Sequence, residues 1–237
     1  MSTHYFILTK PNGSKTDDNT HNQIHSMNPA EVHLLPRTNL IYYTEHGLFE
    51  CRLMEWCKQF CQKDKVFLDI GAHSGTYSIS LSSYVNHVYS FEPQKMTYYA
   101  LCGSVALSGK DNITCLQYGL GSKSQVGEQT LKIVSNDGGG SSLHATSGIL
   151  REEQIQLKTL DSFELKDIGF IKMDVEENEL YVLQGAVQTL EQNNYPRILF
   201  ESNFENQPLF EFIKGLGYTV IPVRGYKNMY LATHLKS

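Results

Sequence analysis

The chain has 237 residues, of which 41% are hydrophobic and 19% are charged, and its formal net charge is −5 at pH 7. This length suits one α/β domain with a buried core and is too short for two full domains. The acidic balance argues against a general nucleic-acid binder, which would carry a basic face, and no apolar run approaches the ~20 residues that cross a bilayer.

The N-terminal quarter of the chain is predicted to form an arm followed by a helix. The first residues lack the basic and apolar regions typical of a signal peptide, and the five cysteines of the chain have no metal-ligand spacing. We therefore expect a cytoplasmic enzyme with reduced thiols. The polar stretch from Thr9 to Asn28 predicts a loop or mobile arm. From Leu48 to Cys61, apolar residues recur at helical spacing. We therefore divide the chain into an N-terminal arm and helical cap, residues 1–64, and a main domain, residues 65–237.

From Lys65 onward, apolar runs alternate with helical periods. We predict strands at Val66–Ile70, His87–Phe91, Ile113–Tyr118, Phe170–Asp174 and Ile198–Glu201, and helices near Thr76–Tyr84, Lys95–Ser108, Glu177–Asn193 and Pro208–Leu216. Such units form a parallel, doubly wound sheet with right-handed crossovers. The tail predicts two further strands, Tyr218–Val223 and Asn228–Ala232. The expected fold is therefore α/β and Rossmann-like, with a seven-stranded sheet closed by an antiparallel C-terminal hairpin.

One segment, residues 120–162, breaks this alternation. It contains a glycine run from Asn136 to Ser142, flanked by strand-like stretches at Gln129–Val134 and Gln154–Leu160. We interpret it as a β-rich insertion over the carboxyl edge of the sheet, where ligands bind in open α/β folds. The glycine run is then either a substrate lid or a plain flexible loop.

The clearest motif is an apolar run that ends in Asp69, followed by a glycine turn and, about twenty residues later, by a run that ends in Glu92. This is the layout of a βαβ nucleotide-binding unit. The glycines lack the spacing of the dinucleotide fingerprint, and Asp69 would repel a diphosphate. A ligand with a ribose, a cationic or zwitterionic end and no phosphate fits better, and S-adenosylmethionine (SAM) is such a ligand.

Each candidate cofactor residue has a chemical reason. The Glu92 carboxylate can accept hydrogen bonds from both ribose hydroxyls. Asp69 would either face the methionine ammonium or fix the turn, and His73 would either touch the cofactor carboxylate or lie exposed. The predicted cofactor-binding residues are Asp69, Gly71, Ala72, His73, Gly75, Glu92, Pro93 and Tyr118.

A second block runs from Phe170 to Ala186 and reads FIKMDVEENELYVLQGA. With the glycine turn and Phe91-Glu92-Pro93, it resembles the FkbM family of SAM-dependent methyltransferases. Weaker support comes from Gly140-Ser141-Ser142, Thr159-Leu160-Asp161-Ser162 and Pro196 to Glu201. The resemblance implies O-methylation of hydroxyl groups, often on sugars or polyketide-like products. The family usually has glycine where this chain has Glu177, so we expect a narrower or differently charged site.

Methyl transfer to an aliphatic hydroxyl benefits from a positioned base. Asp174 and Glu176 follow the fourth predicted strand, and Glu201 ends its neighbour. Crowded carboxylates raise one another's pKa, which suits a base near neutral pH. We expect Asp174 to be the base and Glu176 and Glu201 to bind acceptor hydroxyls. Further acceptor-binding candidates are Ser141, Ser142 and Lys172, and His144 is an alternative base.

Several alternatives stay open. The same three acids could instead hold a divalent cation that acidifies the hydroxyl, although no extra histidine ligand favours this. The chain could be a nucleotide-sugar enzyme on a similar sheet, or a SAM-binding module that has lost its chemistry. The expected partner is a small hydroxylated molecule or glycan, with no nucleic acid and no membrane span.

Overall fold

The computed structural model of the chain describes residues 5–8, 31–34, 48, 50–135, 138–202 and 206–236. The arm predicted from Thr9 to Asn28 lies outside these residues. Within the N-terminal part, the strands β1 (Tyr5–Leu8) and β2 (Glu31–Leu34) pair in parallel, apart from the main sheet. Along the described chain, no helix combines the length and the apolar character needed to cross a bilayer.

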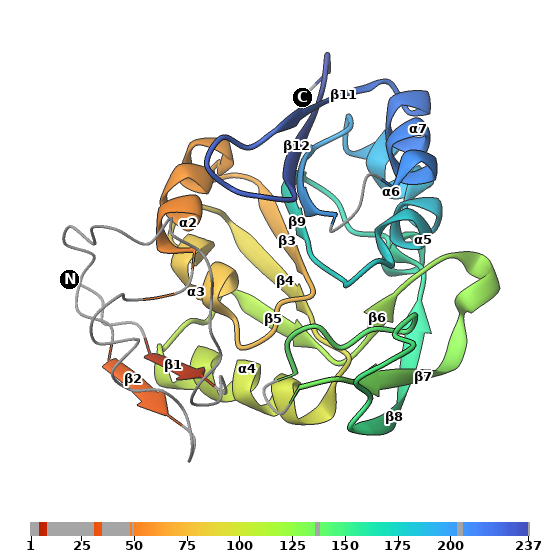
Figure 1. Cartoon of the computed structure of the whole chain (residues 1–237). Helices are drawn as coiled ribbons and strands as arrows, with labels where there is room; N and C mark the ends of the chain where they lie inside the picture. Colours follow the sequence, from red (N-terminus) through yellow and green to blue (C-terminus); the bar gives the residue numbers. More distant parts are fainter. Residues whose placement is uncertain are drawn as a thin grey trace.

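The main sheet has seven strands in the order β11-β12-β10-β9-β3-β4-β5 (Figure 1). The strands are β3 (Val66–Ile70), β4 (His87–Phe91), β5 (Ile113–Leu116), β9 (Ile168–Met173), β10 (Arg197–Glu201), β11 (Tyr218–Pro222) and β12 (Met229–His234). Only β12 runs antiparallel to its neighbours, while the other pairs are parallel. The predicted sheet and its C-terminal hairpin are confirmed.

Helices cover both faces of this sheet. They are α2 (Cys51–Cys57), α3 (Thr76–Ser82), α4 (Lys95–Leu107), α5 (Glu179–Gln184), α6 (Val187–Gln192) and α7 (Gln207–Gly215), with a short 3-10 helix at Lys58–Phe60. Along β3, Leu68 packs with α5, α6 and α7, whereas Phe67 packs with α2 and α3 on the other face. Because alternate side chains of a strand face opposite ways, the central strands need apolar residues at nearly every position.

The helix predicted over Glu177–Asn193 is wrong, since two short helices, α5 and α6, occupy this stretch. Gly185 separates them because it packs on the backbone of Gly121, where an added Cβ would lie 2.1 Å from the carbonyl oxygen. The second helix then starts afresh, with the Asp161 carboxylate accepting hydrogen bonds from Thr189 N and Oγ1, each at 2.8 Å.

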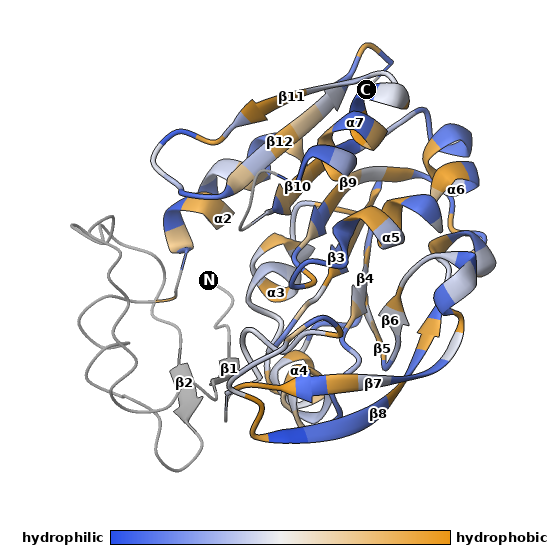
Figure 2. Ribbon diagram, turned by 45° about the vertical axis from the view of Figure 1, so that its right-hand side comes forward, coloured by the Kyte–Doolittle hydropathy of each residue, from blue (hydrophilic) through white to orange (hydrophobic). Residues whose placement is uncertain are grey.

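The predicted β-rich insertion is a three-stranded sheet in the order β6-β8-β7. Its strands are β6 (Gly119–Leu120), β7 (Gly127–Ile133) and β8 (Arg151–Lys158), joined by 3-10 helices at Lys123–Gln125 and, after β8, at Leu160–Phe163. β8 begins hydrophilic and exposed (Figure 2), and only Ile155 and Leu157 turn inward to a small core with β7. The insertion lies beside the carboxyl ends of the main strands.

Candidate active site

A cavity of about 300 Å³ lies where the parallel strands of the main sheet end. The turn after β3, the end of β4, the insertion and the ends of β9 and β10 all line it. Of the residues predicted for the site, Gly71, Ala72, His73, Glu92, Pro93, Tyr118, Ser141, Lys172, Asp174, Glu176 and Glu201 line this cavity. Asp69, Gly75 and Ser142 are not in its wall.

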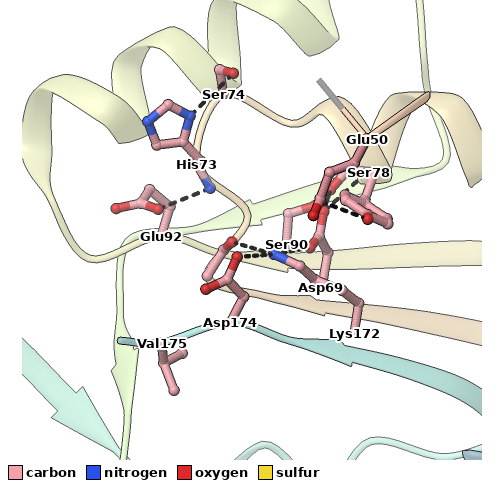
Figure 3. A network of polar contacts seen from close by, with 12 residues as sticks. Glu50, Asp69, His73, Ser74, Ser78, Ser90, Glu92, Lys172, Asp174 and Val175 are labelled. Carbon is pink, nitrogen blue, oxygen red and sulfur yellow. Dashed lines mark hydrogen bonds and ion pairs between the residues drawn. The ribbon is translucent and has the colours of Figure 1, made fainter. Parts of the chain in front are cut away.

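Asp69 lies beneath the turn and is fully buried. Its Oδ2 accepts hydrogen bonds from Ser78 N at 2.9 Å and from Ser78 Oγ at 2.5 Å (Figure 3). Its Oδ1 has no hydrogen-bond partner among the described residues and lies 4.0 Å from Lys172 Nζ. Burial raises the pKa of Asp69, while Lys172 and Ser78 lower it. The geometry matches the turn-fixing role, and contact with a cofactor remains a proposal.

The two glycines of the turn are required by close packing. At Gly71, where φ is 77°, a Cβ would lie 1.8 Å from the carbonyl oxygen of Asp174. At Gly75, where φ is 88°, a Cβ would lie 2.7 Å from Leu101 Cδ1. Gly71 therefore brings the turn directly against the end of β9, and Gly75 lets the turn pack on α4.

Glu92 ends β4 with a buried carboxylate in the cavity wall. Its Oε2 accepts a hydrogen bond from His73 N at 2.9 Å, and its Oε1 accepts one from Gln94 N at 3.0 Å. Burial raises the pKa of Glu92, and His73 and the two amide hydrogen bonds lower it. Each carboxylate oxygen can accept more than one hydrogen bond. The Glu92 carboxylate can therefore still accept hydrogen bonds from both hydroxyls of a vicinal diol.

An apolar wall adjoins Glu92, and sequence reasoning missed most of it. It consists of Phe91, Tyr118, Leu120, Leu131, Ile155 and Leu157. Leu131 comes from β7, and Ile155 and Leu157 come from β8. The sequence predicts these three residues only as parts of strand-like stretches. We call Glu92, the glycine turn and this wall the cofactor end of the cavity.

The register of the sheet brings charged residues of neighbouring strands together. Lys172 on β9 is paired with Asp69 on β3 and with Leu199 on β10, two residues before Glu201. The buried Lys172 Nζ donates to Asp174 Oδ2 at 3.2 Å and to the Gly71 carbonyl at 3.1 Å (Figure 3). Burial opposes its charge, but Asp174 and Asp69 raise the pKa of Lys172 above its ordinary value. Lys172 therefore stays charged and offsets the nearby acids.

Glu176 reaches the cavity by a different route from the one expected. The strand ends at Met173, and Glu176 has a φ of 50°, so strand alternation no longer fixes its direction. Its Oε1 accepts a hydrogen bond from Gly140 N at 3.0 Å, and its carbonyl accepts one from Ser142 Oγ at 2.6 Å. Ser142 thus fastens the glycine run to Glu176, while Ser141 lines the cavity with a buried hydroxyl that no described residue bonds.

Two carboxyls at this end of the cavity have pKa values near or above neutrality. Burial, followed by the charge of Asp174, raises the pKa of Glu176 to about 7. Burial, followed by Asp174, Glu176 and Glu50, raises the pKa of Glu201 to about 8. Groups with such values are matched to proton transfer near neutral pH.

Glu50 is a site residue that sequence reasoning missed. It precedes α2, lines the cavity and accepts a hydrogen bond from the hydroxyl of buried Tyr77 at 2.8 Å. The contact joins residues 27 positions apart, so no local motif announces it. We call Glu50, Asp174, Glu176 and Glu201 the acceptor end of the cavity.

Glu177 neither narrows the cavity nor lines it, contrary to expectation. Its side chain is exposed. Its charge raises the pKa of Glu176, but less than burial and the charge of Asp174 do. Its φ of 75° explains the glycine that the family usually has here, because this region is strained for side chains. We expect Glu177→Gly to raise the free energy of unfolding by ~1 kcal/mol, measured by urea denaturation.

Glu128, an exposed residue of β7, provides the matched control. Glu128→Gly should lower stability by about 0.5–1 kcal/mol, because glycine in a strand costs conformational entropy. Equal destabilisation by both substitutions would contradict the strain at Glu177.

The remaining expectations concern metal ions and His144. Among the residues that the structure describes, no group of three or more His, Cys, Asp or Glu side chains is arranged to hold a metal ion. His144 is not part of the cavity wall; its Nε2 lies 3.0 Å from Asn178 Oδ1, and its ring stacks on Tyr181.

Comparison with known proteins agrees with this arrangement. Residues 69–220, well over half of the chain, match the model of the methyltransferase FkbM domain. The chain belongs to the FkbM methyltransferase family. The matched model describes a methyltransferase domain, and this family implies SAM as the methyl donor. The matched region includes the glycine turn, the cofactor end of the cavity and, of the acceptor end, Asp174, Glu176 and Glu201, whereas Glu50 precedes it.

Among curated proteins, the chain is 29% identical over 141 residues to the hexuronic acid methyltransferase AglP of Haloferax volcanii. That alignment covers 56% of this chain and 55% of the relative, so the chain matches about half of that protein's length.

Two solved structures share the fold. The methyltransferase FkbM of Methylobacillus flagellatus has a TM-score of 0.51 at 17% identity, covering 71% of this chain and 43% of that one. The precorrin-6y C5,15-methyltransferase of Geobacter metallireducens has a TM-score of 0.50 at 16% identity, covering 79% and 88%. At these identities, the two likenesses show a shared fold alone.

Proposed function

We propose that this FkbM methyltransferase transfers the methyl group of SAM to a hydroxyl of a sugar, a glycan or a similar small hydroxylated molecule. The observation that supports the proposal is one cavity with the buried Glu92 carboxylate at one end and a cluster of carboxyls at the other. The name of the Haloferax volcanii relative adds support for a sugar acceptor.

The cofactor end suits SAM. Glu92 offers a carboxylate to the ribose diol, the apolar wall offers a surface to the adenine base, and Gly71 leaves the turn free of a Cβ. When bound, SAM supplies an electrophilic methyl group on a sulfonium and leaves as S-adenosylhomocysteine (SAH). The nearest buried cation, Lys172, is already bonded to Asp174 and to the turn, which favours a cofactor without phosphate over a dinucleotide or nucleotide sugar.

The acceptor end suits the removal of a hydroxyl proton. We propose Glu201 as the general base, because its pKa of about 8 lies near the working pH. Asp174, the base expected from sequence, already engages Lys172 Nζ through its Oδ2 at 3.2 Å. Asp174 and Glu176 would then bind acceptor hydroxyls, and their charges would keep the pKa of Glu201 raised.

A label-transfer assay tests the proposal. The purified chain is incubated with methyl-labelled SAM and a panel of free sugars, glycosides and glycans, with and without a chelator. We expect label in at least one hydroxylated acceptor, and loss of that activity in Glu201→Gln. SAM binding without transfer to any acceptor would favour a SAM-binding module that has lost its chemistry. Transfer that is lost when a chelator is added would favour a divalent cation that acidifies the acceptor hydroxyl.

A further inference from the structure

We infer that the acceptor is uncharged or cationic near its reacting hydroxyl, such as a neutral or amino sugar. The cavity then rejects a carboxylated sugar, in contrast to the hexuronic acid in the name of the Haloferax volcanii relative. This inference deepens the proposed function and rests on it. It concerns the four carboxyl side chains of the acceptor end and the single lysine beside them.

The charges that line the cavity are unbalanced. Among the residues that the structure describes, the acidic ones lining it are Glu50, Glu92, Asp174, Glu176 and Glu201, and Lys172 is the only lysine or arginine there. The charge of Lys172 is already engaged by Asp174 at 3.2 Å and by buried Asp69 at 4.0 Å. An incoming anion therefore finds no free lysine or arginine in this wall.

The acids act on one another at close range. Glu50, Asp174, Glu176 and Glu201 all line one cavity, and the charges of the first three raise the pKa of Glu201. With Glu50 left aside, Glu92, Asp174, Glu176 and Glu201 still line this cavity beside the one charge of Lys172. A like charge brought into such a space is disfavoured, and an ammonium or a hydroxyl donor is favoured.

The proton chemistry points the same way. A carboxylate acceptor is already ionised at neutral pH and needs no base. A hydroxyl needs one, and the acceptor end presents carboxyls whose pKa values are about 7 and about 8. The cavity is thus arranged for a proton-donating acceptor.

The test uses SAH analogues that carry the acceptor's charge with them. In three compounds, the sulfur is replaced by nitrogen that bears an aminoethyl, a hydroxyethyl or a carboxymethyl arm, and SAH itself is the reference. We expect affinity by calorimetry to fall in the order aminoethyl, hydroxyethyl, carboxymethyl, with the last about tenfold or more weaker than the second.

Matched variants locate the effect. Glu50→Gln and Asp174→Asn keep the size of the side chain and remove its charge, so each should shrink the gap between aminoethyl and carboxymethyl arms. Glu128→Gln, which removes an exposed charge on β7 outside the cavity wall, should leave the gap unchanged. Thermal unfolding of each variant with SAH checks that the fold and the cofactor end persist.

The outcomes separate the two proposals. If SAH binds but the carboxymethyl compound binds as tightly as the hydroxyethyl compound, the inference about acceptor charge is overturned and the proposed function stands. The same holds if the gap survives in both charge-removing variants. If SAH and all three analogues fail to bind, the proposed function falls and this inference falls with it.

Discussion

Replacing Glu201 by glutamine is expected to lower turnover by about 10²–10⁴-fold, while the affinity for SAM changes little. Glutamine keeps the size of the side chain but cannot take a proton from the acceptor. Glu201 lies at the end of β10, in the acceptor end of the cavity, and its pKa is raised to about 8. Turnover with a saturating acceptor, together with calorimetric titration of SAM, measures both quantities.

The pH dependence of the rate shows whether Glu201 acts as a base. Because the ionised carboxylate is the active form of a base, the rate should rise with pH up to about 8 and then level off. Glu201→Gln should lose this rise. The neighbouring charged groups, Glu50, Asp174, Glu176 and Lys172, remain in the variant and serve as an internal control. If Asp174→Asn abolishes turnover and Glu201→Gln leaves it intact, the base is Asp174.

Stability should show the same shift independently of activity. Protonated Glu201 is favoured in the folded chain, since its folded pKa of about 8 exceeds the ordinary value of 4.5 for a glutamate. Its contribution is complete below pH 4.5 and is lost as pH rises through 8. Between pH 6 and 9, Tm should therefore fall less in Glu201→Gln than in the unsubstituted chain.

Replacing Glu92 by alanine is expected to weaken SAM binding by roughly tenfold to hundredfold, because it removes charge-assisted hydrogen bonds to the ribose. The substitution also frees the amides of His73 and Gln94, which the carboxylate now accepts at 2.9 and 3.0 Å. Calorimetric titration with SAM measures the loss.

Two companions separate these effects. Glu92→Gln keeps one acceptor oxygen and should lose less affinity than alanine, and Glu177→Gln should lose none. Unchanged affinity in Glu92→Ala would remove Glu92 from the cofactor site.

Local patterns predicted the parts of the fold that local chemistry determines. The boundaries of β3 and β4 follow from apolar runs that end at a glycine turn and at Pro93. Alternation along β9 predicts that the side chains of Lys172 and Met173 point to opposite faces of the sheet. Met173 packs in the core with α5, α6 and α7, whereas Lys172 Nζ bonds the Gly71 carbonyl. The antiparallel hairpin at the C-terminus followed in the same way from two short strands around a turn.

Long-range packing determined what the sequence could not predict. The break at Gly185 depends on Gly121, far away in the chain, and the helical period alone gave one continuous helix. Glu50 enters the site through a contact with Tyr77. The ion pair of Asp174 with Lys172 lies within one strand end, but its strength depends on burial, which a pattern of residue types does not measure.

The most direct test of the account is a crystal structure of the chain with SAH. The account predicts that both ribose hydroxyls bond the Glu92 carboxylate and that the sulfur faces the acceptor end, with Glu201 open to an acceptor. A ribose bound elsewhere, or a sulfur directed away from Asp174 and Glu201, would contradict the assignment of both ends of the cavity.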